Sequence, residues 1–334
     1  MIMFANKNIL ITGGTGSFGN KLISKLVSIK KDKPKKIIIF SRDELKQFNL
    51  QKKYPIKKYP NLRFFLGDIR DKDRLKMAFF EVDYIIHAAA LKQVPAAEYN
   101  PIEFIKTNIL GAQNIIEASI ECGVKKVIAL STDKASSPIN LYGATKLCSD
   151  KLFLSANNLS GSRKTIFSVV RYGNVFGSRG SVAPFFLEHQ KKGFLPITDK
   201  NMTRFNILLE DAVKLVYLAI KKGIGGEIFI PKTPSFKITD LAKAISPKCK
   251  LKIIGIREGE KIHEELISKA ESIHTFDLKT FYVICGNEKS RKKYSKNIKN
   301  KVKEGFVYNS LDNKKYLSVA ELKTMAQNIK KNKL

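Results

Sequence analysis

The chain has 334 residues, with 61 lysine and arginine residues against 30 aspartate and glutamate residues, and a formal net charge of +31. Hydrophobic residues make up 43% and charged residues 27%, which excludes wholesale disorder, and the length favours two domains or one large domain with an extension. No apolar stretch approaches the ~18 residues that cross a bilayer. The start fits no signal peptide, and the four cysteines do not follow a zinc or disulfide spacing. We therefore expect a cytoplasmic protein with no membrane partner and no metal.

The positive charge is mostly lysine, because only 10 of the 61 basic residues are arginine. The lysines are scattered along the chain, whereas a nucleic-acid-binding protein would more often gather arginine and aromatic residues on one face. We interpret the charge as a solvated surface and expect no specific nucleic-acid partner. The densest basic run, residues 289–303, is expected to form an exposed loop or a short helix.

Strand and helix signals alternate in the first half of the chain. Short apolar runs predict strands at 7–12, 36–40, 62–66, 84–88, 127–130 and 165–170, and helical spacing predicts helices at 21–29, 101–122 and 141–157. This alternation predicts an α/β fold with a doubly wound parallel sheet, a Rossmann domain, over residues 1–172. The looser pattern of residues 173–334 predicts a smaller, partly interleaved α/β substrate-binding region.

A glycine-rich segment separates the first predicted strand from the first helix. Its sequence is TGGTGSFG, residues 12–19, with glycine at 13, 16 and 19. Glycine permits the tight turn, lets backbone amides approach a pyrophosphate and lets the helix pack closely on the sheet. Because the motif lies directly between a strand and a helix, it predicts a dinucleotide-binding loop.

The end of the second strand bears on the choice of dinucleotide. An NAD enzyme usually places an acidic residue there, on the ribose 2′-hydroxyl. This chain has Ser41 and Arg42, which suit the 2′-phosphate of NADP, although Asp43 could serve as the ribose acid. We expect NADP. Asp68 and Ile69, after the third strand, are placed for the adenine, and Ala88 allows close approach to the cofactor ribose.

Tyr142 and Lys146 lie four residues apart on one helix, after a strand that ends in Ser131 and Thr132. An ammonium beside a phenol lowers the phenol's pKa, so that the tyrosine can take a hydroxyl proton during hydride transfer. The YxxxK spacing together with the glycine loop predicts an oxidoreductase-type active site, in which the lysine also holds the nicotinamide ribose.

The sequence resembles the extended short-chain dehydrogenase/reductases that modify nucleotide sugars, and most closely the inverting UDP-N-acetylglucosamine 4,6-dehydratases (5-epimerising) of pseudaminic acid biosynthesis. The matching segments span almost the whole chain: TGGTGSFG (12–19), SRDELKQ (41–47), ALKQVPAAEYNP (90–101), STDKA (131–135), NLYGATKL (140–147), VVRYGNVFGSRGSV (169–182), ITDKNMTRF (197–205) and GIREGEKIHEELIS (255–268). One departure is Glu258, where relatives often have proline, and residues 289–303 do not align securely.

The resemblance implies a reaction that is redox-neutral overall. Oxidation at C4 of UDP-N-acetylglucosamine acidifies the C5 hydrogen, which Lys134, if neutral, removes while Asp133 protonates the departing C6 hydroxyl. Hydride then returns to C6, and C5 is reprotonated from the opposite face to give the L-arabino 4-keto sugar. Related retaining enzymes usually carry Asp-Glu where this chain has Asp133-Lys134.

The resemblance also assigns the remaining site residues and suggests a homo-oligomer. The expected catalytic residues are Thr132, Asp133, Lys134, Tyr142 and Lys146. The expected cofactor-binding residues are Gly13, Thr15, Gly16, Ser17, Phe18, Gly19, Ser41, Arg42, Asp43, Glu44, Leu45, Lys46, Asp68, Ile69, Ala88, Tyr142, Lys146, Val175, Phe176, Gly177, Ser178 and Arg179. The expected substrate-binding residues are Lys92, Leu130, Ser131, Asn174, Val182, Thr198 and Arg257.

Other functions stay open at this point. The same scaffold could host a retaining dehydratase or a C4 epimerase, since fold does not fix function. A non-catalytic NADP-binding regulator that uses its charge to bind nucleic acid is the alternative of another class. His87 is interpreted as a packing or hydrogen-bonding residue, and His263, beside Glu264 and Glu265, as part of a helix surface rather than a metal site.

Overall fold

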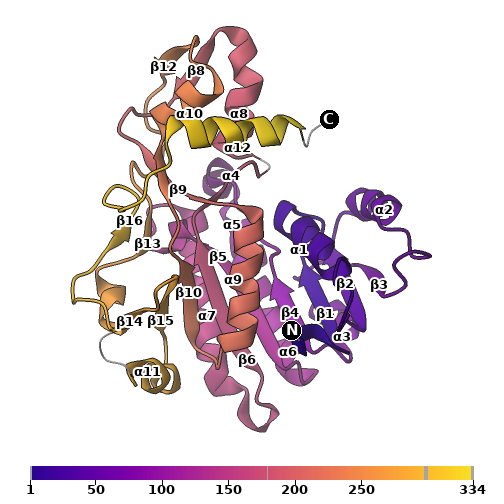
Figure 1. Cartoon of the computed structure of the whole chain (residues 1–334). Coiled ribbons are helices and arrows are strands. Elements are labelled where there is room, and N and C mark those ends of the chain that lie inside the picture. The colour runs from indigo at the N-terminus through magenta and orange to yellow at the C-terminus, as the bar shows by residue number, and fades with distance from the viewer. Residues whose placement is uncertain (1, 179, 297–299, 332–334) are drawn as a thin grey trace.

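The computed structural model describes residues 2–178, 180–296 and 300–331, and a nine-stranded sheet runs through the centre of this part of the chain (Figure 1). Its strands are β1 (Asn8–Thr12), β2 (Lys36–Ser41), β3 (Leu62–Leu66), β4 (Tyr84–His87), β5 (Lys126–Thr132), β6 (Ile166–Tyr172), β10 (Glu227–Pro231), β14 (Thr275–Asp277) and β15 (Phe281–Cys285). The spatial order is β14-β15-β10-β6-β5-β4-β1-β2-β3. The strands from β3 to β10 pair in parallel, whereas β15 and β14 are antiparallel. The predicted doubly wound parallel sheet is confirmed.

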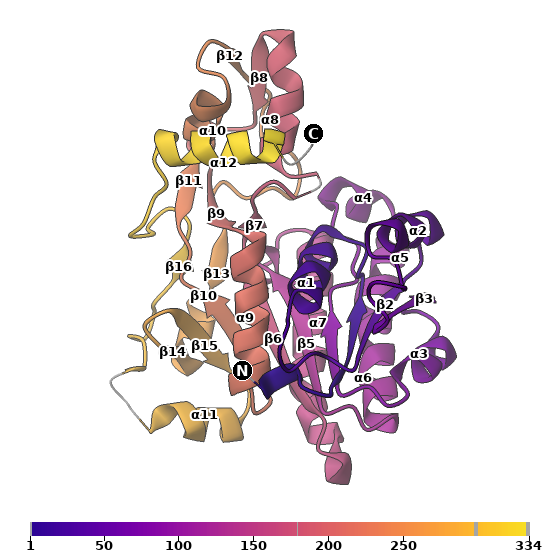
Figure 2. The same ribbon diagram turned by 45° about the vertical axis from the view of Figure 1, so that its right-hand side comes forward.

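Helices cover both faces of the sheet (Figure 2). One layer holds α1 (Ser17–Val27), α2 (Glu44–Lys53) and α9 (Leu209–Lys222), and the other holds α3 (Lys72–Phe79), α6 (Gly111–Glu121) and α7 (Leu141–Leu159). The alternation of side chains along a strand explains this arrangement. On β2, Ile37 and Ile39 pack with the first layer, and Ile38 and Phe40 pack with the second.

The predicted helix at 101–122 consists of several helical segments. The chain passes through α4 (Val94–Tyr99) and α5 (Pro101–Phe104) into a π-helical turn (Ile105–Leu110) that continues as α6. Asn108, within the π-helical turn, is buried and hydrogen-bonds Leu91 through both its side-chain oxygen and its nitrogen. The turn therefore ties this helix to the segment that follows β4.

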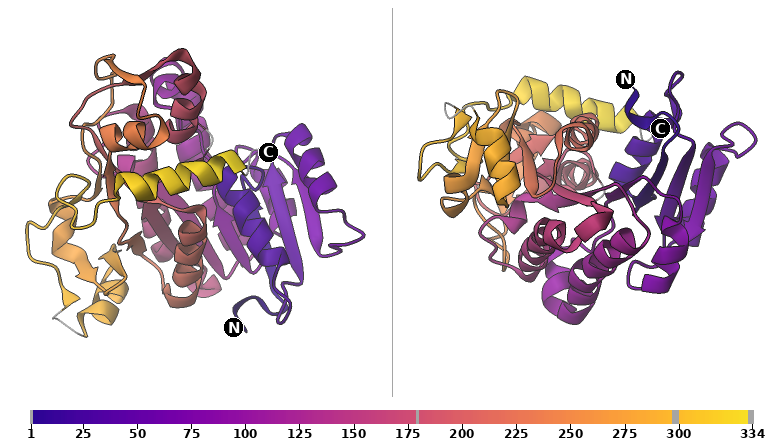
Figure 3. Two further views of the ribbon diagram at one scale, coloured as in Figure 1. Left: turned by 45° about the horizontal axis from the view of Figure 1, so that its top comes forward. Right: turned by 90° about the horizontal axis from the view of Figure 1, so that it is seen from below.

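Part of the second half of the chain forms a small lobe above the carboxyl-terminal ends of the sheet strands (Figure 1), while β10, β14, β15 and α9 join the main sheet and its helix layer. It contains a three-stranded sheet of β7 (Asn174–Val175), β9 (Thr203–Ile207) and β11 (Ser235–Lys237), and the pairs β8 (Phe194–Ile197) with β12 (Lys250–Ile253) and β13 (Glu265–Ile267) with β16 (Tyr308–Asn309). Helices α8 (Val182–His189), α10 (Ile238–Ile245) and α12 (Val319–Lys331) share one apolar core. Helix α12 crosses this lobe toward the N-terminal half of the chain (Figure 3). The division of the chain at residue 172 stays a prediction.

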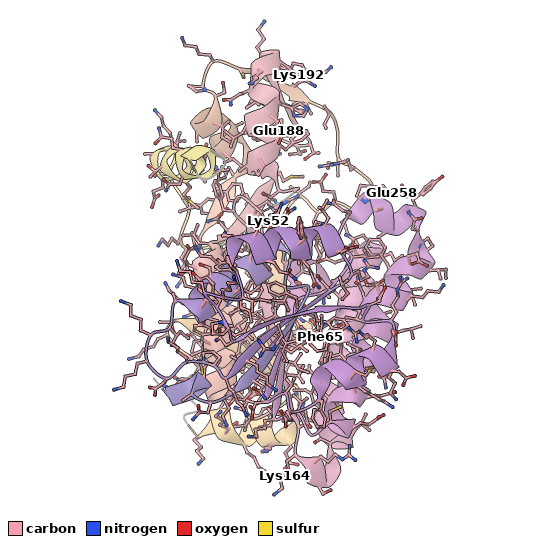
Figure 4. The ribbon with its side chains drawn as sticks, turned by 90° about the vertical axis from the view of Figure 1, so that its right-hand side faces the viewer. Lys52, Phe65, Lys164, Glu188, Lys192 and Glu258 are labelled. Carbon is pink, nitrogen blue, oxygen red and sulfur yellow. The ribbon has the colours of Figure 1, made fainter. Side chains whose placement is uncertain are left out.

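The basic residues are spread over the molecule. Among the side chains labelled in Figure 4, Lys192 lies beyond α8 at one end, Lys52 on α2, and Lys164 at the opposite end. Within the basic run, residues 288–295 form helix α11 (Glu288–Ser295), and residues 297–299 lie outside the described part of the chain. No helix among the described residues combines the length and the apolar character that a membrane span requires.

Candidate active site

Three adjoining cavities follow the carboxyl-terminal edge of the sheet, where the strand order reverses at β1. The first has a volume of about 320 Å³ and shares Gly13 and Gly16 with the second, of about 460 Å³. The second shares Lys92 and Lys134 with the third, of about 440 Å³, which reaches into the upper lobe. Open α/β sheets bind ligands at such a reversal.

Two glycines of the loop, Gly13 and Gly19, lie where a Cβ would clash with backbone atoms. Gly13 has φ +66°, and a Cβ there would lie 2.8 Å from the backbone nitrogen of Ala89. A Cβ on Gly19 would lie 2.4 Å from the carbonyl oxygen of Gly14. The first glycine therefore allows the turn to meet the end of β4, and the second allows α1 to pack against the loop.

The N-terminus of α1 is left open for a ligand. Helices α2 and α3 are capped by the carboxylates of Asp43 and Asp71, whereas no side chain caps α1 after Gly16 and its first turn holds no acidic residue. The backbone N–H groups of a helix's first turn and its dipole attract phosphate. The residues present thus fit the pyrophosphate of a dinucleotide.

Arg42 and Asp68 face each other in the first cavity. Arg42 Nη1 lies 3.4 Å from Asp68 Oδ2, and Arg70 Nη2 binds the same oxygen at 2.7 Å. Burial raises the pKa of Asp68, but hydrogen bonds from Arg70 and the charge of Arg42 outweigh it and hold this pKa below its usual value. The Arg42 side chain is half exposed, so the guanidinium keeps one side open to a ligand.

Ser41 and Asp43 have local partners that bear on the choice of cofactor. The buried Gln47 donates from Nε2 to Ser41 Oγ at 3.0 Å, which leaves the hydroxyl hydrogen of Ser41 available to a ligand. Asp43 Oδ1 accepts from the backbone nitrogen of Lys46 at 2.9 Å and so caps α2, and Lys46 Nζ binds the other oxygen of the same carboxylate. The carboxylate of Asp43 is thereby engaged by its own helix.

His87 fastens the end of β4 to the end of β1. The Thr12 hydroxyl oxygen accepts from the backbone nitrogens of Ala88 and Ala89, so its hydrogen points to His87 Nδ1, 2.8 Å away. Burial, followed by the charge of Lys146, lowers the pKa of His87 to about 3. The imidazole ring is therefore neutral and hydrogen-bonded, in agreement with the interpretation of His87 as a hydrogen-bonding residue.

The second cavity brings the five expected catalytic residues together at the end of β5 and the start of α7: Thr132, Asp133, Lys134, Tyr142 and Lys146. Helix α7 begins at this point because Asn140 caps it, accepting from the backbone nitrogen of Gly143 at 2.7 Å. A Cβ on Gly143 would lie 2.2 Å from the carbonyl oxygen of Lys134. Glycine at 143 therefore lets the helix bring Tyr142 against the turn that carries Asp133 and Lys134.

Lys134 lies between two buried carboxylates. Its Nζ is 3.2 Å from Asp133 Oδ1 and 3.1 Å from Glu264 Oε1. Burial lowers the pKa of Lys134, but the charges of Asp133 and Glu264 outweigh it, and this pKa is raised. Burial also raises the pKa of Asp133, whose Oδ1 additionally accepts from the Thr132 hydroxyl at 3.0 Å. In the free protein the lysine is an ammonium held by an ion pair.

The expected lowering of the Tyr142 pKa is wrong for this structure, and Lys146 is not among the groups with the largest effects on it. Burial dominates and raises the pKa of Tyr142 to about 12. The groups that lower it are Lys134, through its charge, and Thr132, through a hydrogen bond. Burial lowers the pKa of Lys146 as well, since the side chain is only 3% exposed.

A buried network lies behind these residues. Asp150 Oδ2 accepts from Ser131 Oγ at 2.7 Å and from Arg171 Nη2 at 3.3 Å. The fully buried Arg171 also binds Glu271 at 2.9 Å. This network fixes Ser131 at the end of β5, so Ser131 lines the cavity with a defined orientation.

The third cavity lies between α8, β8 and the segment around residues 254–264. Of the expected substrate-binding residues it contains Lys92, Asn174, Val182, Thr198 and Arg257, while Leu130 and Ser131 line the second cavity. Arg257 Nε lies 3.3 Å from Glu260 Oε2. Arg204, a residue that the sequence did not single out, lies 3.4 Å from Glu260 and 3.6 Å from Glu264.

The structure brings most of the expected cofactor residues to the first two cavities: Gly13, Thr15, Gly16, Ser17, Phe18, Gly19, Ser41, Arg42, Asp43, Lys46, Asp68, Ile69, Ala88, Val175 and Ser178. It does not place Glu44, Leu45, Phe176 or Gly177 among the lining residues. Leu45 is 67% exposed on α2, because that helix buries Gln47 and Leu50 instead. Gly177, at φ +72°, packs against Ile329 of α12. Arg179 lies outside the described residues.

The helix expected around His263 is not present. Residues 261–264 are a non-helical approach to β13, and Glu264 is 2% exposed. His263 Nδ1 is 2.8 Å from Thr203 Oγ1. The local sequence could not reveal that Glu264 turns inward, because its partners Lys134 and Arg204 are distant in the chain.

Comparisons with known proteins agree with this geometry. The family model described as polysaccharide biosynthesis protein matches residues 9–286. The chain is 56% identical over 329 residues to UDP-N-acetylglucosamine 4,6-dehydratase (inverting) from Campylobacter jejuni, covering 96% of this chain and 97% of that protein. It is 43% identical over 336 residues to UDP-glucose 4-epimerase from Rickettsia bellii, covering 98% and 97%.

Solved structures give the same fold. Pen from Bacillus thuringiensis superposes with a TM-score of 0.87 at 39% identity, over 98% of this chain and 99% of that one. DesIV, a dTDP-glucose 4,6-dehydratase from Streptomyces venezuelae solved with NAD and TYD bound, has a TM-score of 0.67 at 23% identity, over 76% and 86%, a likeness of fold alone. The chain therefore belongs to the polysaccharide biosynthesis protein family and has the fold of the extended short-chain dehydrogenase/reductases.

Proposed function

We propose that the protein is an NADP-dependent hydro-lyase that dehydrates UDP-N-acetylglucosamine across C5 and C6 and inverts C5, giving UDP-2-acetamido-2,6-dideoxy-β-L-arabino-hexos-4-ulose. The observation that carries this proposal is the ion pair of the buried Asp133 with the partly buried Lys134, in the same cavity as Tyr142 and Lys146. A tyrosine and a lysine alone suffice for oxidation at C4, whereas elimination needs an added acid and base. The 56% identity to the Campylobacter jejuni dehydratase supports the same reaction.

NADP rather than NAD is favoured by the first cavity. The guanidinium of Arg42 is half exposed there, the Ser41 hydroxyl is oriented by Gln47, and Asp43 is engaged in capping α2. A 2′-phosphate would receive both a charge-assisted and a neutral hydrogen bond. When bound, the cofactor supplies a reversible oxidation at C4 of the sugar. Because the reaction is redox-neutral overall, we expect the cofactor to stay bound between turnovers.

Each of the residues of the second cavity has a separate role in the proposed reaction. Tyr142 accepts the proton of the C4 hydroxyl, with Lys134 and Thr132 favouring its phenolate, and Lys146 holds the cofactor ribose. A proton moved from Lys134 Nζ to Asp133 Oδ1, across the 3.2 Å hydrogen bond, yields a neutral amine and a carboxylic acid. The amine removes the C5 proton, and the acid protonates the C6 hydroxyl, which leaves as water.

The substrate is proposed to span the second and third cavities, with the sugar near Lys134 and the UDP in the upper lobe. Arg257 and Thr198 lie in the third cavity, where a guanidinium and a hydroxyl suit a diphosphate or a ribose. We further propose a cytoplasmic homo-oligomer that supplies a pathway of the pseudaminic acid type. Gel filtration with light scattering tests the assembly.

The C4 epimerase is the second candidate, since the Rickettsia bellii relative carries that name. An epimerase needs no acid or base for C5, so the Asp133–Lys134 pair disfavours it. NMR of the product formed from UDP-N-acetylglucosamine decides between them. A 4-keto-6-deoxy sugar supports the dehydratase, and UDP-N-acetylgalactosamine would establish the epimerase.

A further inference from the structure

Glu264 is a buried carboxylate to which the proposed elimination assigns no role. Its side chain is 2% exposed, and Oε1 accepts from Lys134 Nζ at 3.1 Å. Arg204 Nε lies 3.6 Å from the same oxygen, while Oε2 has no hydrogen-bond partner among the described residues. A carboxylate in such a place loses much solvation, and breaking its pair leaves an uncompensated charge.

The backbone of Glu264 is held from behind by the C-terminal segment. Its nitrogen donates to Ser310 Oγ at 2.9 Å, and the nitrogen of Ser310 donates to the carbonyl oxygen of Glu264 at 2.8 Å. Ser310 Oγ also lies 2.7 Å from Thr203 Oγ1, and its carbonyl accepts from the hydroxyl of Tyr316 at 2.7 Å. The fold thus fixes the backbone of Glu264 through Ser310, which Thr203 and Tyr316 hold in turn, and so places the carboxylate beside Lys134.

Resting on the proposed function, we propose that Glu264 is a positioning residue for Lys134, an ionised carboxylate that aims the amine at C5 and stabilises the ammonium formed there. In the step itself, the C5–H bond breaks and the proton joins Lys134 Nζ. The C5 electron pair forms the C5=C6 bond as the C6–O bond breaks. The departing oxygen takes the proton of Asp133 and leaves as water.

Asp133 cannot supply the stabilising charge at the start of this step. It must be a neutral acid until the C6 oxygen takes its proton, so the amine would then face no anion without Glu264. In the resting protein the charges of Lys134 and Arg204 outweigh burial and hold the pKa of Glu264 below its usual value, and Arg204 keeps its charge beside Glu264 when Lys134 is neutral. The arrangement follows the logic of a catalytic triad, in which a third group orients the base and stabilises its charged form.

The test compares Glu264→Gln with Glu265→Gln. Glu265 is the neighbouring carboxylate, but its Oε1 accepts from the hydroxyls of Ser136 and Ser137, which a glutamine oxygen can also do. Turnover of UDP-N-acetylglucosamine, the appearance of reduced nicotinamide in a single turnover, and incorporation of solvent deuterium at C5 are measured for both variants and the wild type. The wild type is measured first, because a wild type that forms no dehydrated product ends the proposed function and this inference together.

With an active wild type, we expect Glu264→Gln to slow deuterium incorporation at C5 on the order of 10²-fold, while reduction of the nicotinamide persists. The acidic limb of the pH–rate profile reports protonation of the Asp133–Lys134 pair at Asp133, whose pKa the charge of Glu264 raises, so in Glu264→Gln this limb should move to lower pH by roughly 1–3 units. Glu265→Gln should leave the limb and the rate near those of the wild type.

Two results would overturn this inference and leave the proposed function standing. One is an unchanged rate in Glu264→Gln. The other is a slower rate with an unmoved acidic limb, because that combination indicates a merely structural role. If Glu264→Gln does not fold, Glu264→Asp carries the test, since it keeps the charge but withdraws it by one methylene. It should slow incorporation at C5 and leave cofactor affinity unchanged. An unaffected rate in that variant would contradict the proposal.

Discussion

Replacing Lys134 with methionine isolates the charge at the centre of the site. Methionine keeps most of the apolar stem of lysine and removes the ammonium, so packing changes little. Asp133 and Glu264, at 1% and 2% exposure, then lose the cation that lies 3.2 and 3.1 Å away. We expect the variant to lose elimination and also to be less stable than the wild type at pH 7.

The size of the stability loss follows from the network. Removing one partner of a buried ion pair typically costs about 3–5 kcal/mol. Arg204 stays 3.6 Å from Glu264, and Asp133 can take up a proton, so we expect a loss of about 2 kcal/mol. For 334 residues the entropy of unfolding is about 0.7 kcal/mol per kelvin, so the melting temperature should fall by about 3 °C.

The stability difference between Lys134→Met and the wild type should also depend on pH, in a direction set by Asp133. Burial already raises the pKa of Asp133 in the wild type, and losing the Lys134 ammonium, which lowers it, raises it further. Folded Lys134→Met therefore keeps its extra proton to a higher pH than the wild type does, and its stability falls more as pH rises through this window. The difference from the wild type should therefore shrink between pH 7 and pH 5. Urea unfolding at both pH values measures it, and binding of NADP should persist. An equal or larger difference at pH 5 would refute the reasoning.

Three further expectations follow from other parts of the site. Gly143→Ala places a Cβ 2.2 Å from the carbonyl oxygen of Lys134, so it should lower the free energy of unfolding in urea by ~1–3 kcal/mol and reduce kcat. The control Ser155→Ala, at an exposed position of the same helix, should change neither. Normal turnover in Gly143→Ala would contradict this packing. Arg42→Asp should weaken NADP relative to NAD by roughly 10- to 100-fold in titrations of the purified protein, and a wild type that prefers NAD would show the Arg42 argument to be wrong. Binding to DNA should be weak, indifferent to sequence and steeply reduced by salt, whereas tight sequence-selective binding at physiological salt would restore the regulator hypothesis.

The framework of the fold could be predicted from the sequence because its signals are local. The isoleucine-rich run at 36–40 is buried on both sides, as parallel strands require, and the glycines at 13 and 19 mark a turn that tolerates no Cβ. The clustering of the candidate catalytic residues was also predictable, since Tyr142 and Lys146 share one helix and the Asp133–Lys134 turn directly follows β5.

What the sequence did not reveal depends on contacts between distant segments. Glu264 lies 130 positions from Lys134, and only the pairing of β13 with β16 and the bonds to Ser310 turn it inward. The direction of the Tyr142 pKa shift depends on how deeply the fold buries the phenol, which the YxxxK spacing does not specify. The local pattern therefore suggested an exposed helix at 263–265 and a lowered phenol pKa, and tertiary packing reversed both.

The stereochemistry at C5 tests the central claim most directly. UDP-N-acetylglucosamine is turned over by the wild-type protein in deuterated water, and the product is analysed by NMR. In the proposed mechanism Lys134 removes the C5 proton and a proton returns on the other face. The product should therefore carry deuterium at C5 with inverted, L-arabino configuration, and C6 should carry the hydrogen that began at C4. A 4-keto product with retained D configuration at C5 would contradict the inverting assignment.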